Sequence, residues 1–287
     1  MIRFLHLLVL VSIACATATA EATVNWQLAP DIDIGQTPKD AVVSSDGKRI
    51  YVLTKAGDIM IFSSEGQLED TIHAGEDISF ISPGPSDNQL LIGSGKGKTV
   101  RMLSVEFVRE IDISGAPVLG PHDAPVTIIV FMDYQCPYCA RLMPVLKQVL
   151  QKYPSRVKVA YKQYPLKMHK AALSAAAASL VAARKGRFHD LHDVLMEDYK
   201  NLTDEIILDK ASDLGFVRET FRKEMDSPDI MTLIQKDMQD GKRAGVSGIP
   251  SVFINGKRLK NRSLAGFQQM IDREMTALEG PPATEAP

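Results

Sequence analysis

The chain of 287 residues carries 33 lysines and arginines against 35 aspartates and glutamates, for a formal net charge of −2. Hydrophobic residues make up 45% of it and charged residues 24%, which is ordinary for a folded protein of one or two domains. The balance excludes the strongly basic surface that a nucleic-acid partner would require.

The N-terminus has the pattern of an export signal. Arg3 is followed by a short apolar core, Phe4 to Ile13, and by the small-residue cleavage site Ala18-Thr19-Ala20. The apolar run is too short to cross a bilayer as a helix. We therefore expect residues 1–20 to be a removed signal peptide and the mature protein to be periplasmic or secreted. A lipoprotein attached through Cys15 is the less favoured alternative, because the residues before it match a lipid-attachment box poorly.

Residues 21–115 form a region of short β-type runs separated by Gly, Ser and Asp turns. The runs repeat weakly with a spacing of about 40 residues, and the pattern resembles the four-stranded blades of a β-propeller. The Gly-rich stretch 93–98 lacks the spacing of a phosphate loop, so a turn is predicted there. The expected strands are residues 40–43, 49–53, 59–62 and 71–72 in the first unit and 78–81, 90–92, 100–103 and 111–113 in the second.

Two such units cannot close a ring, and repeat units need neighbours to bury their faces. We therefore expect this all-β region to pack as a small sandwich or to complete its core by self-association. Three chains forming a six-bladed ring would be one form of such a homo-oligomer. A small β domain without a special role remains the alternative.

Residues 116–280 alternate strands with helical stretches, after a junction rich in Pro and Gly. The continuous apolar run Val126–Met132 predicts a central strand buried on both faces. Further along the chain, Pro144 lies inside the next helix, where an interior proline favours a kink, and Asn255-Gly256 predicts a hairpin. The other expected elements are a strand at 157–161, helices at 169–184, 188–198, from 203 onward, 229–244 and 264–278, strands at 251–254 and 257–259, and a disordered tail at 281–287.

The sequence Cys136-Pro137-Tyr138-Cys139 follows the central strand and opens a helix. This placement puts Cys136 at a helix N-terminus, where unpaired N–H groups stabilise a thiolate. We expect Cys136 to be an exposed nucleophile with a depressed pKa and Cys139 to be a more buried, resolving cysteine with a higher pKa. Pro137 should preset the first helical turn, and Tyr138 should shape the rim of the site.

Other uses of the cysteines fit less well. Once Cys15 leaves with the signal, only Cys136 and Cys139 remain, and a disulfide closing so short a loop would stabilise the fold little. Zinc requires four ligands, and His189 and His192 are expected to cap and pack a helix instead of binding metal. We therefore expect no metal and no cofactor other than a redox-active Cys136–Cys139 disulfide.

Over residues 116–280 the chain resembles the DsbA-like family of exported thiol–disulfide oxidoreductases. The resemblance implies an α/β thioredoxin fold with a helical insertion at about 166–244, a cis peptide bond at Pro250 beside the dithiol, and a substrate-binding role for Ile249, for which core packing is the alternative. It also implies exported proteins with thiols or disulfides as substrates and a membrane redox partner. It rests on four segments in order: residues 131–139, 164–166, 186–195 and 245–256.

The chain departs from the oxidase members in two places. Val130 stands where many of them have a glutamate, six residues before the first cysteine, so a buried proton acceptor is missing there. The segment 130–133 is closer to the isomerases DsbC and DsbG, the dipeptide Pro137-Tyr138 resembles DsbG and glutaredoxins more than DsbA, and Ile249 is as in thioredoxin. These features favour a disulfide isomerase or reductase. A monomeric dithiol oxidase is the first alternative, and a non-enzymatic scaffold or chaperone is the second.

Overall fold

The computed structural model describes residue 25 and residues 27–279, so the expected signal peptide (1–20) and tail (281–287) lie outside the described residues. The chain divides into two compact units, Met1–Ser104 and Val105–Pro287. The division falls earlier than the expected position at 116, because residues after Ser104 already pack in the second unit: Val108 forms a β-bridge with Lys257. We call the first the β unit and the second the thioredoxin unit.

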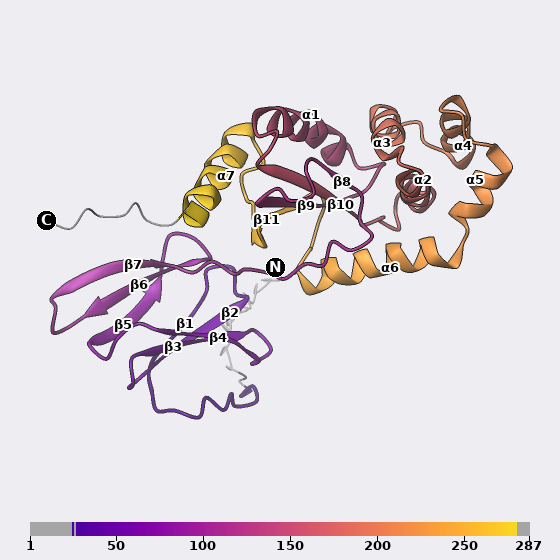
Figure 1. Cartoon of the computed structure of the whole chain (residues 1–287). Helices are drawn as coiled ribbons and strands as arrows, with labels where there is room; N and C mark the ends of the chain where they lie inside the picture. Colours follow the sequence, from indigo (N-terminus) through magenta and orange to yellow (C-terminus); the bar gives the residue numbers. More distant parts are fainter. Residues whose placement is uncertain (1–24, 26, 280–287) are drawn as a thin grey trace, which may run out of the picture. The chain divides into compact units, whose positions relative to one another are not determined.

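The first sheet of the β unit is an antiparallel meander in the order β1-β2-β3-β4 (Figure 1). Its inner strands have apolar residues on both faces, and both faces are buried: Leu53 and Ile59 are fully enclosed on one face, and Val52, Met60 and Phe62 form a cluster on the other. The strands are β1 (Pro38–Val43), β2 (Arg49–Thr54), β3 (Asp58–Ser63) and β4 (Leu68–His73).

The second sheet of the β unit has three strands, β5 (Ile78–Pro83), β6 (Gln89–Ser94) and β7 (Thr99–Ser104). The fourth strand expected at 111–113 is wrong, because Ile111 and Ile113 pack against the sheet of the thioredoxin unit. The turn expected in the Gly-rich stretch is confirmed between β6 and β7. All-β character is therefore confirmed for this region, but a propeller is not.

The thioredoxin unit is built on a five-stranded sheet in the order β12-β11-β9-β10-β8. The central strand β9 pairs in parallel with β10 and antiparallel with β11. It is buried on both faces, as its continuous apolar sequence predicts. Alternate residues of β9 point to opposite faces: Val130 contacts the larger core and Phe131 the smaller one. The strands are β8 (Val118–Leu119), β9 (Val126–Met132), β10 (Val157–Gln163), β11 (Ser251–Ile254) and β12 (Lys257–Arg258).

Helices cover both faces of this sheet, with α1 and α7 on one face and α6 on the other (Figure 1). Helices α2 to α5 form a block beyond one end of the sheet, which corresponds to the expected helical insertion. The helices are α1 (Pro137–Lys152), α2 (Ala172–Arg184), α3 (Phe188–Glu197), α4 (Asp204–Asp213), α5 (Arg218–Met225), α6 (Pro228–Arg243) and α7 (Leu264–Glu279).

A buried cation fastens α6 to the sheet. The side chain of Lys162, on β10, is fully enclosed, and its Nζ atom lies 2.6 Å from Asp237 and 2.7 Å from Asp240. It also donates to the main-chain oxygen of Asp112 at 2.8 Å. Burial raises the pKa of Asp237, against the lowering effect of Lys162. Charged groups this deep must be paired, so this cluster fixes α6 against the sheet.

Candidate active site

The dithiol lies where β9 passes into α1. Cys136 occupies the N-cap position with φ −81° and ψ 119°, and Pro137 begins the helix. The main-chain N–H of Cys136 donates to the oxygen of Asp133 at 3.2 Å, and its own oxygen accepts from Ala140 at 3.0 Å. The strand–turn–helix arrangement expected from the sequence is thus present, with Cys136 at the helix N-terminus.

The two cysteines have opposite acidities. The pKa of Cys136 is lowered to about 6, chiefly by a hydrogen bond from the Cys139 thiol and further by the main-chain N–H groups of Cys139 and Tyr138. Burial raises the pKa of Cys139 well above its usual range. The expected directions are confirmed, but the helix amides are not the largest cause at Cys136, because the neighbouring thiol donates directly to its sulfur.

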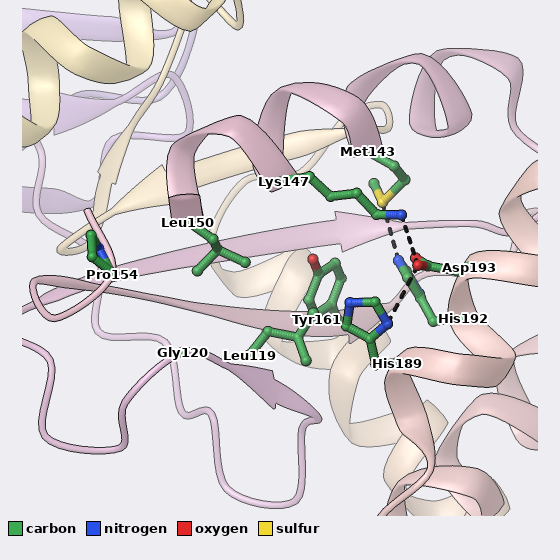
Figure 2. Close-up of a pocket in the computed structure, with 10 residues that line it drawn as sticks. All are labelled: Leu119, Gly120, Met143, Lys147, Leu150, Pro154, Tyr161, His189, His192 and Asp193. Carbon is green, nitrogen blue, oxygen red and sulfur yellow. Dashed lines mark hydrogen bonds and ion pairs between the residues drawn. The ribbon is translucent and has the colours of Figure 1, made fainter. Parts of the chain in front are cut away.

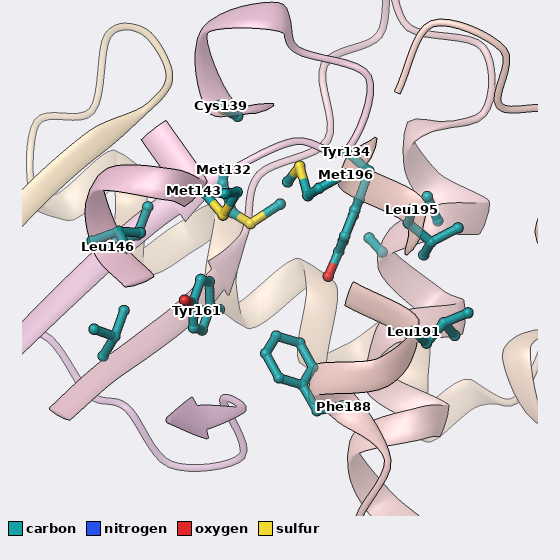
Figure 3. Close-up of a cluster of buried hydrophobic side chains, with 14 of the residues drawn as sticks. Met132, Tyr134, Cys139, Met143, Leu146, Tyr161, Phe188, Leu191, Leu195 and Met196 are labelled. Carbon is teal, nitrogen blue, oxygen red and sulfur yellow. The ribbon is translucent and has the colours of Figure 1, made fainter. Parts of the chain in front are cut away.

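The expectation that Cys136 is exposed is wrong: the residue is 4% exposed, against 0% for Cys139. One contact that covers it comes from the loop before β11, where the Cys136 thiol lies 3.9 Å from the carbonyl oxygen of Ile249. Cys139 belongs to a buried cluster that also contains Met132, Met143 and Met196 (Figure 3). These apolar surroundings disfavour a second thiolate.

The loop before β11 completes the site. The Ile249–Pro250 peptide bond is cis, as expected. Pro250 is buried and its carbonyl oxygen accepts from Arg262 at 2.6 Å, while Ile249 is half-buried and packs against both cores. At the rim Tyr138 is 63% exposed, and the Arg141 guanidinium lies 4.8 Å from the centroid of its ring.

Sequence reasoning gave no role to Asp133, although it ends the apolar strand three residues before Cys136. Its side chain is fully buried. Its carboxylate accepts from the main-chain N–H groups of Gln135 at 2.7 Å and Leu166 at 2.8 Å, and lies 2.8 Å from Nδ1 of His169. Val130, which stands where many oxidase members are expected to have glutamate, is buried in the core. The structure therefore has a buried carboxylate near the dithiol after all, at another position, and the polar residue ending an apolar run was its signal.

The two residues after Asp133 fasten the active-site loop to the helical block. The Tyr134 hydroxyl lies 2.8 Å from Nδ1 of His192 on α3. The Gln135 side chain accepts from the N–H of Ala171 at 2.6 Å and donates to the oxygen of Leu202 at 3.2 Å. We call residues 133–135 the approach segment, since all three of its side chains contact the helical insertion.

A cavity of about 280 Å³ lies between α1, α3 and β10, and its lining does not include the cysteines (Figure 2). His189 and His192 contribute to it but point to different partners. His192 is buried, with Nε2 3.1 Å from the sulfur of Met143, and burial lowers its pKa to about 3. His189 is 3.3 Å from Asp193 at the surface. Among the described residues, no group of three or more His, Cys, Asp or Glu side chains is arranged to hold a metal.

Comparison with known proteins gives a family match over the region that contains this site. A thioredoxin family model matches residues 113–273, more than half of the chain. Among curated proteins, the Na(+)/H(+) antiporter NhaA 3 of Salinispora tropica is 31% identical over 169 residues, which is 58% of this chain and 25% of the antiporter. The probable disulfide bond formation protein D of Bacillus cereus is 29% identical over 169 residues, covering 55% of this chain and 77% of that protein.

Two solved structures have a similar fold. BdbD from Bacillus subtilis, in its oxidised form, superposes with a TM-score of 0.54 at 24% identity, covering 59% of this chain and 98% of BdbD. A thioredoxin-like oxidoreductase from Silicibacter pomeroyi gives 0.51 at 26% identity, covering 58% of this chain and 94% of that protein. The chain spans about a quarter of the length of the antiporters it matches first. No helix in the described part of the chain is long and apolar enough to cross a membrane.

Proposed function

The chain belongs to the thioredoxin family through residues 113–273, and from this premise we propose that it is an exported thiol–disulfide oxidoreductase that acts on protein disulfides through Cys136 and Cys139. The observation that carries the proposal is the pair of opposite acidities: the pKa of Cys136 is lowered to about 6, while burial raises that of its neighbour. One sulfur is thus ready to attack at neutral pH and the other is held back as a thiol.

In the reductive direction the Cys136 thiolate attacks one sulfur of a substrate disulfide. A Cys136–substrate disulfide forms and the other substrate sulfur leaves as a thiolate. The Cys139 thiol then loses its proton and attacks the sulfur of Cys136, which releases the second substrate thiolate. Cys136 and Cys139 end as a disulfide, and the substrate has gained two electrons and, from solvent, two protons. The same steps in reverse oxidise a substrate dithiol.

The parts around the dithiol have roles that follow from their positions. Pro137 presets the first turn of α1, and the exposed Tyr138 ring shapes the rim that a substrate chain would meet. The half-buried Ile249, next to the cis bond at Pro250, is the residue proposed to bind the substrate backbone. Its carbonyl oxygen lies 3.9 Å from the nucleophilic sulfur, so a chain bound along this loop would present its disulfide to Cys136.

We favour disulfide isomerisation or reduction, because Val130 and the Pro137-Tyr138 dipeptide resemble those of isomerases. Oxidation of substrate dithiols is the second candidate, and it is supported by the name of the Bacillus cereus relative, a probable disulfide bond formation protein. We further propose that the substrates are exported proteins, that a membrane protein restores the redox state of the dithiol, and that the β unit joins copies of the chain.

The test of the chemistry uses two single variants that differ only in which sulfur is lost. Cys136→Ser should abolish refolding of a scrambled-disulfide substrate, and Cys139→Ser should accumulate covalent enzyme–substrate disulfides that a reductant releases. Full activity in a double Cys136→Ser, Cys139→Ser variant would overturn the proposal. Protection of a cysteine-free client by that same variant would instead support the chaperone alternative.

The test of direction and assembly needs two measurements. The equilibrium with glutathione should place the potential of the dithiol below that of a strong oxidase, if isomerisation or reduction is correct. Sedimentation of the full chain should give a multiple of the 31.5 kDa chain mass, less any signal peptide, whereas a chain that starts at Val105 should sediment as a monomer. A full chain that is monomeric at all concentrations would contradict the role given to the β unit.

A further inference from the structure

The buried carboxylate beside the dithiol has no part in the exchange steps above. Asp133 lies in the loop between β9 and α1, and three donors converge on it: the N–H groups of Gln135 and Leu166, and the ring of His169. Two of these donors belong to the segment that follows β10. The carboxylate is therefore fixed from both sides, and its position relative to the cysteines does not depend on a flexible side chain.

Asp133 touches the dithiol through its main chain. Its carbonyl oxygen accepts from the N–H of Cys136 at 3.2 Å, and its N–H donates to the sulfur of Cys139. The residue that carries the negative charge is thus bonded to both cysteines. A charge buried in this way is screened by salt and water far less than a surface charge.

We propose that the Asp133 carboxylate, held in place by His169, sets the redox poise of the Cys136–Cys139 pair by opposing negative charge on its sulfur atoms. The inference rests on the proposed function and identifies the group that sets the redox potential of the dithiol. The charge of Asp133 raises the pKa of both cysteines, against the larger effects that lower that of Cys136. Because a stabilised thiolate favours the reduced form, a group that opposes the thiolate makes the dithiol less oxidising. Asp133 and His169 act here as positioning residues.

His169 lies between the buried carboxylate of Asp133 and the protein surface. Its side chain is 21% exposed, while that of Asp133 is fully buried. Its Nδ1 atom lies 2.8 Å from the carboxylate, so the ring orients the charge by donating a hydrogen bond from Nδ1–H, which only one of its two neutral tautomers carries, and that bond partly offsets the charge. Removing the ring should therefore leave the effect of Asp133 on the cysteines intact or strengthen it, whereas removing the carboxylate should abolish it.

The main variant is Asp133→Asn in the full chain, which keeps the shape and an acceptor oxygen and removes the charge. We expect thiolate absorbance of Cys136 to titrate about 1 pH unit lower than in the wild type. At neutral pH the equilibrium with glutathione should shift toward the reduced dithiol by about tenfold, which corresponds to about 30 mV. A titration and an equilibrium that both match the wild type would overturn the proposal.

Two further variants separate charge from loosened structure. His169→Gln keeps the carboxylate and should leave the Cys136 titration where it is or move it to higher pH, opposite to Asp133→Asn. If both variants shift the titration downward, a disordered loop explains the result and the proposal is wrong. Asp237→Asn is the matched control, because it removes a buried carboxylate paired with Lys162, and it should lower stability without moving the titration.

If Asp133→Asn does not fold, the sign of the His169→Gln shift still decides, since a downward shift contradicts the proposal. The thiolate titration needs no substrate. If Asp133→Asn shifts the titration as expected but the wild type shows no disulfide exchange, the proposed function is rejected and this inference is kept. If the wild type exchanges disulfides but Asp133→Asn shows no shift, this inference is rejected and the proposed function is kept.

Discussion

The two units of the chain bury apolar residues equally well at their centres but differ at their margins. In the thioredoxin unit helices cover both faces of the central strand. In the β unit the outer strands β4 and β7 carry exposed apolar side chains: Leu68, Val100 and Met102 are each more than half exposed. One unit has a reactive pair whose chemistry follows from its residues, while the described residues of the other form a core without such a pair. The comparison teaches that a sequence reveals function only where particular residue types carry out a reaction.

The largest expected effect concerns the buried cation of the thioredoxin unit. Lys162→Met removes the charge between Asp237 and Asp240 and should cost this unit about 3–5 kcal/mol of unfolding free energy, because it leaves buried carboxylates without their partner. Urea unfolding measures it. The exposed pair Lys185–Glu224 is the control, and Lys185→Met should cost less than about 1 kcal/mol. Equal losses for the two lysines would show that the cluster is not structurally important.

The next effect asks whether the units are stable independently. Ile59 is fully buried in the β unit, and Ile59→Ala should cost about 2–5 kcal/mol through the cavity it leaves. We expect the unfolding transition of the β unit alone to move in calorimetry, and the thiolate titration of Cys136 to stay unchanged. Leu191→Ala in the thioredoxin unit is the reciprocal control. A single transition that moves with either substitution would mean that the units unfold together.

The pH dependence that comes from the cysteines belongs to the thioredoxin unit. The folded pKa of Cys136 is about 6, below its ordinary 9.0, so the thiolate contribution to the stability of the reduced protein is complete above about pH 9 and is lost as the pH falls toward 6. Cys139, with its raised pKa, opposes stability at still higher pH. Alkylation of Cys136 should be half-maximal near pH 6. A midpoint near the ordinary value would contradict the activation of this thiol.

The smallest effect compares exposed apolar side chains in the two units. Tyr138 is 63% exposed and Val100 is 61% exposed. Replacement of either by Ala should change the unfolding free energy by no more than about 0.5 kcal/mol. Tyr138→Ala should raise the KM for a protein substrate and leave exchange with glutathione unchanged, while Val100→Ala should change neither. An effect of Tyr138→Ala on glutathione exchange would show that this residue takes part in thiol–disulfide exchange itself and not only in substrate binding.

Much of the thioredoxin unit was predictable because its signals are local. The continuous apolar run of β9 and the Thr203 cap of α4, which accepts from the N–H of Ile206, were both read correctly. Helix α5 was missed because it is mostly polar and buries only Phe221 and Met225. Strand β8 is two residues long, too short to show a period. Ile111 and Ile113 alternate with polar residues as in a strand, but their side chains cover a face of the thioredoxin sheet. That placement depends on tertiary contacts, which the local pattern does not reveal.

The site was predictable in its reactive residues and less so in its environment. Cys136, Cys139 and Pro250 carry their chemistry in their identity. The burial of Cys136 depends in part on a loop more than a hundred residues away, whose Ile249 carbonyl oxygen lies against its sulfur. The hydrogen bond from the Cys139 thiol depends on side-chain orientation in the first turn of α1, which the spacing of the motif does not specify. The role of Asp133 depends on Leu166 and His169, which approach it only because β10 runs parallel to β9.

The approach segment bears on attempts to transplant this chemistry. Tyr134 and Gln135 hold the loop before Cys136 to α3, to the start of α2 and to the main chain at Leu202. A graft of the four residues 136–139 onto another scaffold would transfer the two cysteines without these hydrogen bonds. A graft that keeps the geometry of the dithiol would have to include the helical insertion, so the insertion and the dithiol form one structural unit.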